Sequence, residues 1–120
     1  MNVLLTGGLG YIGSNIVSSF LNSEYTPVIF DNLSNSSIDY LDTIKEVYGA
    51  NVEFIEGDLR DKGSIHNALS IFNVDAVIHL AGLKSVSESV ADPDSYYENN
   101  VVGSKNLIQS MEELKIFNLV

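Results

Sequence analysis

Cysteine is absent from the 120-residue sequence, and basic side chains are scarce. The lack of cysteine excludes disulfides and thiolate metal sites, and it fits a reducing compartment. Six lysines and arginines stand against sixteen aspartates and glutamates, which gives a formal net charge of −10. Such a charge repels duplex nucleic acid and anionic membrane surfaces, so we expect neither as a partner. An anionic ligand would have to be held by backbone N–H groups and a few placed cations.

Long apolar runs are also missing. No stretch approaches the roughly eighteen apolar residues of a membrane-spanning helix, and the chain begins with a predicted strand rather than a signal peptide. We therefore expect a cytoplasmic protein. The 45% of apolar residues suffice for a hydrophobic core, and 120 residues are the length of one domain.

The most informative stretch is Thr6–Gly13, which follows the apolar run Val3–Leu5. Apolar residues then recur at helical spacing, so the glycines lie in a turn between a strand and a helix. Gly7 would allow the tight turn, Gly10 a close approach of the backbone to a ligand, and Gly13 close packing of the helix on the sheet. The free N–H groups of the first helical turn would then face an anion such as a pyrophosphate. Without the flanking strand and helix, the same glycines would indicate only a flexible turn.

An acidic residue follows at the distance that a dinucleotide-binding fold requires. The apolar run 27–30 predicts a second buried strand, and Asp31 ends it 18 residues after Gly13. Near this offset, such folds place the carboxylate that binds the adenosine ribose. An aspartate before Asn32 is also an ordinary way to end a strand and start a turn. Because the turn, the helix and the acid agree, we interpret Asp31 as the ribose ligand.

The rest of the chain alternates predicted strands and helices. We expect strands at 52–56, 75–80 and 116–120, the last one cut short, and helices at 38–48, 61–72 and 92–115. This alternation predicts an α/β fold, a Rossmann-type doubly wound parallel sheet with strand order 3-2-1-4-5. Gly103 lies inside the last predicted helix, where glycine costs about 1 kcal/mol relative to alanine. We therefore expect a close backbone or ligand approach at Gly103.

Three polar residues near the ends of later strands each have two interpretations. Asp58 leaves the third strand at its carboxyl end, where open α/β sheets bind ligands, but it could also be a solvated loop acid. Lys84 follows the fourth strand and is a candidate cation for a cofactor, although a lone lysine is usually solvated. His79 has no neighbouring ligand set, so we interpret it as a partly buried strand residue rather than a metal ligand or acid-base group.

Longer motifs resemble the extended short-chain dehydrogenase/reductase family. They are the three spaced glycines of the first turn, Asp31–Ser36, Gly57–Asp61 and Tyr96–Gly103. Ala81–Ser89 resembles the branch of the family that epimerises UDP-hexoses at C4, and it differs from the usual sequence of sugar-nucleotide dehydratases and reductases. The resemblance covers the whole chain and corresponds to the N-terminal, NAD-binding third of such an enzyme.

The resemblance implies NAD as the cofactor and a UDP-hexose as the substrate of the intact enzyme. Hydride would pass from the sugar C4 to bound NAD and return through a 4-keto intermediate. Asp31, with no arginine beside it, favours NAD over NADP because a 2′-phosphate would meet a carboxylate. The implied cofactor contacts are Gly7, Gly10, Tyr11, Ile12, Gly13, Asp31, Asn32, Asn35, Ser36, Asp58, Leu59, Leu80, Ala81, Gly82, Lys84 and Asn99.

The chain departs from the family pattern in its catalytic residues. None of its six tyrosines is followed four positions later by lysine, so the Tyr-x-x-x-Lys pair is absent. The assisting serine and the nucleotide-sugar domain are absent too. We therefore expect no catalytic residue, no metal site and no activity of the chain alone. Its cut strand and uncovered sheet face predict association, either as a homodimer or through the exposed surface.

Two other functions remain open at this stage. One is a sugar-nucleotide dehydratase or an epimerase of different specificity, which residues lining the hexose pocket would distinguish. The other is a non-catalytic module that uses the fold to sense a dinucleotide.

Overall fold

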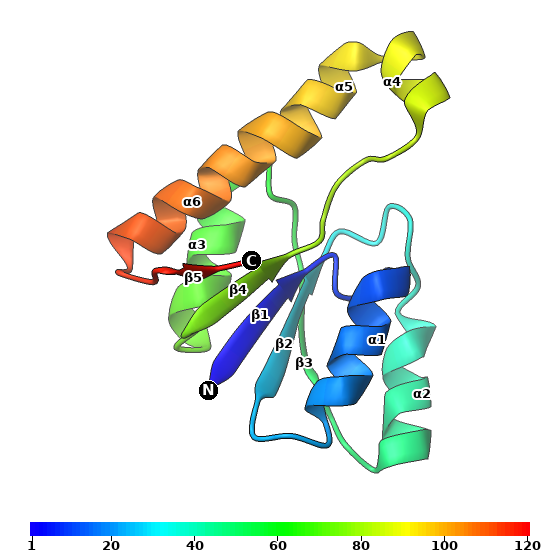
Figure 1. Ribbon diagram of the computed structural model, residues 1–120, viewed down its shortest axis with the longest axis vertical. Coiled ribbons are helices and arrows are strands. Elements are labelled where there is room, and N and C mark those ends of the chain that lie inside the picture. Colours follow the sequence, from blue (N-terminus) through cyan, green and yellow to red (C-terminus); the bar gives the residue numbers. More distant parts are fainter.

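The computed structural model describes residues 1–120 and contains one parallel sheet with helices on both faces (Figure 1). Its strands run in the spatial order β3-β2-β1-β4-β5, and every neighbouring pair is parallel. The predicted fold class and strand order are therefore confirmed. The strands are β1 (Asn2–Thr6), β2 (Thr26–Asp31), β3 (Glu53–Glu56), β4 (Ala76–His79) and β5 (Asn118–Leu119).

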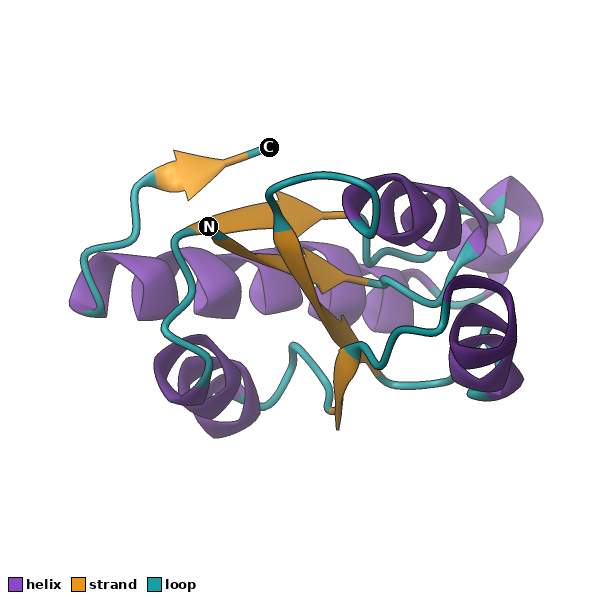
Figure 2. Cartoon of the chain, turned by 90° about the horizontal axis from the view of Figure 1, so that it is seen from below, coloured by secondary structure: helices purple, strands orange, loops and turns teal.

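One pair of helices lies on each side of the twisted sheet (Figures 1 and 2). Helices α1 (Tyr11–Phe20) and α2 (Asp39–Tyr48) cover one face, and α3 (Lys62–Ile71) and α6 (Gly103–Glu113) cover the other. Two short helices, α4 (Val86–Ala91) and α5 (Pro93–Tyr97), extend beyond the sheet. None of the helices has the length and hydropathy that crossing a bilayer requires.

Alternate residues of the central strands separate into two hydrophobic cores. Leu4 lies between Val28 and Val77 in the sheet, and all three pack against the helices α3 and α6. Leu5 and its neighbour Ile29 point the other way, toward α1 and α2. Strands β1 and β2 are thus buried on both faces, which explains why they are continuous apolar runs without a polar face.

The long C-terminal helix differs from the uninterrupted helix predicted over 92–115. A π-helical turn, η1 (Glu98–Val102), separates α5 from α6. The predicted start is confirmed, because the Asp92 side chain accepts a hydrogen bond from the Ser95 N–H at 3.2 Å and proline follows at once. A Cβ added at Gly103 would lie 3.0 Å from the Cβ of Leu59. The expected close approach at Gly103 is therefore a packing contact with the loop after β3.

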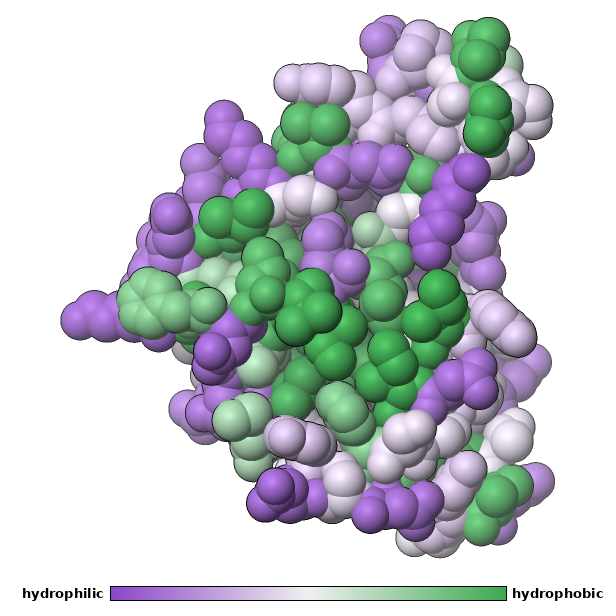
Figure 3. All heavy atoms as spheres, in the orientation of Figure 1, coloured by the Kyte–Doolittle hydropathy of each residue, from purple (hydrophilic) through white to green (hydrophobic).

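The last strand is shorter than predicted and lies at the sheet edge. β5 comprises only two residues, and Val120 beyond it adds a further pair of backbone hydrogen bonds to β4. Apolar side chains gather over the sheet between β5 and α1, on the face turned to the viewer in Figure 3. Val120 is 87% exposed. This surface agrees with the expected uncovered face, whereas association through it stays a prediction.

Candidate functional site

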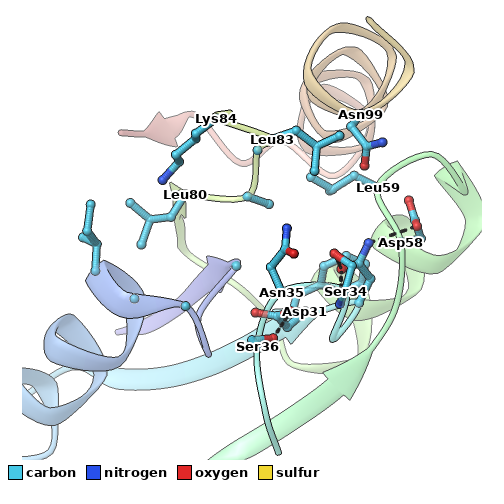
Figure 4. A pocket seen from close by; sticks show the side chains of 18 of the residues that line it. Asp31, Ser34, Asn35, Ser36, Asp58, Leu59, Leu80, Leu83, Lys84 and Asn99 are labelled. Atoms are coloured by element: carbon cyan, nitrogen blue, oxygen red, sulfur yellow. Dashed lines mark hydrogen bonds between the residues drawn. The ribbon is translucent and has the colours of Figure 1, made fainter. Parts of the chain in front are cut away.

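A cleft of about 510 Å³ lies at the carboxyl ends of the first four strands (Figure 4). It opens where the chain order reverses, between β1 and β4, which is the position at which open α/β sheets bind ligands. Every residue predicted to contact a cofactor lines this cleft, from Gly7 to Asn99. The structure therefore brings together predicted residues from the glycine turn, from the loops after β2, β3 and β4, and from the π-helical turn. Their contact with a cofactor stays a prediction.

The glycine turn between β1 and α1 forms the floor of the cleft. Gly7 has a φ of 67°, and a Cβ on it would lie 2.9 Å from the backbone nitrogen of Ala81. A Cβ on Gly13 would lie 2.6 Å from the Gly7 oxygen, so both positions require glycine. A Cβ on Gly10 would meet only the Gly7 oxygen, at 3.2 Å. The backbone at Gly10 is therefore open on its other sides, as an approaching ligand needs.

Helix α1 begins at this turn without a side-chain cap. Gly10 occupies its N-cap position, and no acidic residue lies in its first turn. In contrast, the side chains of Asp61, Ser85 and Asp92 cap helices α3, α4 and α5. The first N–H groups of α1 therefore lack an internal acceptor, and together with the helix dipole they favour an anion at this end of the cleft.

Asp31 is buried and links the loop after β2 to the glycine turn. Its Oδ1 accepts hydrogen bonds from the Leu33 N–H at 3.0 Å and the Ser36 hydroxyl at 2.8 Å. Its Oδ2 accepts one from the Leu9 N–H at 3.1 Å. A carboxylate offers about four acceptor positions, so Oδ2 retains one for a ligand hydroxyl. Both interpretations of Asp31 thus have support, because it organises the turn and also faces the cleft.

Asp58 at the rim of the cleft is ion-paired rather than simply solvated. Arg60 donates to it from Nε at 3.0 Å, from Nη2 at 2.7 Å and from its backbone N–H at 2.9 Å. Asn32 adds a fourth hydrogen bond at 3.2 Å. The Arg60 side chain, more than any other group, holds the pKa of the Asp58 carboxyl far below its usual range. Asp58 therefore stays ionised, and Arg60 takes up most of its acceptor capacity.

Lys84 is the only basic residue that lines the cleft. Its side chain is exposed and makes no hydrogen bond or ion pair within the chain. Figure 4 shows it above the cleft, beside Leu80 and across from the loop that carries Asn35. Three acidic residues also line the cleft, so Lys84 is the one side-chain cation available to an anionic ligand.

His79 is held inside a chain of hydrogen bonds. Ser104 gives its hydroxyl hydrogen to the Asn100 carbonyl at 2.7 Å, so its oxygen accepts from His79 Nε2 at 2.8 Å. His79 Nδ1 is then the acceptor for the Thr6 hydroxyl at 2.7 Å. This pattern requires neutral histidine, and burial lowers its pKa. The partly buried strand interpretation of His79 is confirmed.

Thr6 extends this chain of hydrogen bonds to the wall of the cleft. Its oxygen accepts from the N–H groups of Leu80 and Ala81, both at 3.2 Å. The end of β1 therefore fixes the start of the loop after β4. No three histidine, aspartate or glutamate side chains meet as a metal ligand set would.

Several residues that line the cleft were missed by sequence reasoning. Gly57 belongs to a predicted turn and could have been included from its position after β3. The others depend on side-chain directions and on the approach of α5 to the loop after β4, which residue spacing does not reveal. The missed residues are Phe30, Ser34, Gly57, Leu83, Ser85, Glu88 and Tyr96.

The hydrogen bonds of His79 predict a specific pH dependence of stability. Because the pKa is lowered in the folded state, the unfolded chain takes up the proton first, and the free energy of unfolding should fall as the pH drops below about 6.5. His79→Gln preserves one donor and one acceptor but cannot titrate, so its stability should decline less between pH 7 and 5. Urea unfolding at each pH would measure this. An NMR titration that gave His79 a pKa of 6.5 or more would contradict the assignment.

Comparisons with known proteins extend over nearly the whole chain. Residues 4–119 match the sequence profile of a family described as GDP-mannose 4,6 dehydratase. The chain is 46% identical over 119 residues to the UDP-glucose 4-epimerase of Neisseria meningitidis serogroup A. This match covers 99% of the chain and 35% of that protein. The chain thus spans about a third of the length of this curated relative.

Two solved structures of UDP-glucose 4-epimerases have a similar fold, each with a TM-score of 0.94 and 36% sequence identity. The Bifidobacterium longum enzyme was solved in complex with NAD+ and UDP, and the match covers 99% of this chain and 36% of that one. The Stenotrophomonas maltophila enzyme was solved with bound NAD and formylated UDP-arabinopyranose, and the match covers 99% of this chain and 35% of that one.

Proposed function

Because the chain belongs to the family described as GDP-mannose 4,6 dehydratase, we propose that it is the NAD-binding part of a UDP-glucose 4-epimerase. The observation that carries the NAD-binding part of this proposal is the uncapped start of α1, which faces the cleft with Asp31 beside it. A dinucleotide needs an anion site and a ribose acceptor in this arrangement.

The donors of the cleft fit the charged and polar parts of NAD. The N–H groups at the start of α1 would hold the pyrophosphate, and the open backbone at Gly10 leaves room for it. Asp31 Oδ2 would accept from the adenosine ribose, and Asp58 and Leu59 would border the adenine. Lys84 and Asn99 would line the part of the cleft that receives the rest of the NAD molecule. A 2′-phosphate would be repelled by Asp31, which supports NAD rather than NADP.

The choice of an epimerase is supported by the relatives rather than by the cleft. The family carries the description of a dehydratase, whereas the similar proteins are UDP-glucose 4-epimerases. The Ala81–Ser89 motif resembles the epimerase branch as well. A sugar-nucleotide dehydratase is therefore the second candidate. Both would use NAD, which accepts a hydride when bound, and both would act on a sugar nucleotide in the cytoplasm.

The chain contributes binding and orientation of the cofactor rather than acid-base chemistry. Epimerisation requires a base at the sugar 4-hydroxyl, held against the nicotinamide. His79 does not line the cleft, and both of its ring nitrogens are engaged by hydroxyl groups. The sequence contains no Tyr-x-x-x-Lys pair. We infer that the 120 residues alone bind NAD without turning over a sugar nucleotide.

The first test concerns the selectivity of Asp31. Asp31→Asn should weaken NAD binding by roughly the 1.5–3 kcal/mol of a hydrogen bond to a charged group, and it should raise the NADP/NAD affinity ratio. Asp75→Asn is the matched control, because Asp75 also accepts a backbone N–H, that of Asn2 at 2.7 Å, at the other end of the sheet. Calorimetry would measure both affinities. An unchanged ratio would remove Asp31 from the ribose site.

The second test separates binding from turnover. The purified 120-residue chain should bind ADP-ribose but should not convert UDP-galactose in the presence of NAD. Light scattering on the same sample would measure association through the exposed sheet face. Turnover above background would contradict the inference that the 120 residues bind NAD without turning over a sugar nucleotide. A folded sample that failed to bind ADP-ribose would contradict the proposed cofactor site.

A further inference from the structure

Two side chains of the long helix hold the loop that carries Lys84. The Tyr96 hydroxyl oxygen accepts a hydrogen bond from the Ser85 N–H at 2.9 Å. Asn100 binds both backbone groups of Leu83, accepting from its N–H and donating to its oxygen, each at 2.8 Å. Because Leu83 and Ser85 flank Lys84, the backbone of Lys84 is fixed on both sides.

The Tyr96 hydroxyl also connects the loop to α4. It donates to Glu88 Oε2 at 3.1 Å, and Ser85 caps the N-terminus of α4. This short helix contains no buried residue, and Val86 and Val90 are each 79% exposed. Apolar packing therefore does not hold α4 in place. The Tyr96 hydroxyl provides the hydrogen bonds that tie the start of α4 to α5.

The position of the Lys84 backbone matters because the side chain has no other restraint. Its ammonium group makes no hydrogen bond or ion pair within the chain. A lysine stem is flexible, so only its fixed backbone limits where the charge lies. Fixing that backbone before the ligand arrives reduces the ordering that binding must supply.

We propose that Tyr96 is a positioning residue whose hydroxyl fixes Ser85 and thereby sets the place of the Lys84 ammonium above the cleft. The inference rests on the proposed function, since it concerns the affinity of this cleft for NAD. It differs from a direct contact of Tyr96 with the cofactor, because its effect must pass through Lys84.

Tyr96→Phe tests the proposal by removing only the hydroxyl group. It should raise the dissociation constant of the 120-residue chain for NAD by roughly fivefold, as expected for the loss of hydrogen bonds that order the loop. Tyr97→Phe is the matched control, because Tyr97 is 59% exposed and its hydroxyl makes no hydrogen bond within the chain. Its dissociation constant should stay within about twofold of the wild-type value.

The same substitution in a Lys84→Met background distinguishes positioning from direct contact. If Tyr96 acts through Lys84, the double variant should bind NAD as the Lys84→Met variant does. A Tyr96→Phe effect that persists without the lysine overturns the proposal. So does an unchanged affinity of Tyr96→Phe when the wild-type chain binds NAD.

Hydrogen exchange supplies a readout that needs no ligand. The amide of Ser85 should exchange faster in Tyr96→Phe than in the wild-type or Tyr97→Phe chains, because it loses its acceptor. Equal exchange rates would show that the Tyr96 hydroxyl does not hold the Ser85 amide, and this would overturn the proposal. A wild-type chain that binds neither NAD nor ADP would instead contradict the proposed function, and Tyr96 would then have no cofactor-related role.

Discussion

The start of α1 lies in direct backbone contact with the turn that follows β1, and the geometry of the cleft depends on this contact. Gly13 approaches Gly7 so closely that a Cβ would lie 2.6 Å from the Gly7 oxygen. Gly7 in turn lies against the backbone of Ala81, where the loop after β4 begins. One turn therefore brings together the N-terminus of a helix and the ends of two strands. Any side chain at Gly7 or Gly13 would separate these parts.

The electrostatics of the cleft are local rather than global. The chain has a formal net charge of −10, and three carboxylates line the cleft. Each of them is engaged by neighbours: Asp31 by the Leu9 N–H, Asp58 by Arg60 and Glu88 by the Tyr96 hydroxyl. The Lys84 ammonium group and the first N–H groups of α1 are left without partners in the chain. An anion is thus favoured at one end of the cleft despite the overall charge of the protein.

The positions of the strands could be predicted from the sequence, because they depend on short-range patterns. The strand order followed from the fold type that the alternation of strands and helices indicates, and most of the cofactor contacts followed from the resemblance to the dehydrogenase/reductase family. Apolar runs locate the strands, and strand ends in a parallel sheet meet at one edge, so Asp31, Asp58 and Lys84 were expected near the cleft that they line. Their contact with a cofactor stays a prediction. Contacts between distant residues were not predictable. Asp31 binds Leu9, and Tyr96 binds Ser85, through side-chain directions that no spacing reveals. The π-helical turn Glu98–Val102 was not predicted, because residues 92–115 were expected to form one helix, and the last strand is shorter than predicted.

The central claim is that the start of α1 receives the pyrophosphate of NAD. Amide chemical shifts of the isotopically labelled chain, followed by NMR during titration with NAD, test it most directly. The account predicts saturable shifts that are largest at Tyr11, Ile12 and Gly13, with smaller ones around Asp31. Shifts confined to residues outside the cleft, or none at the first turn of α1 at saturating NAD, would contradict it.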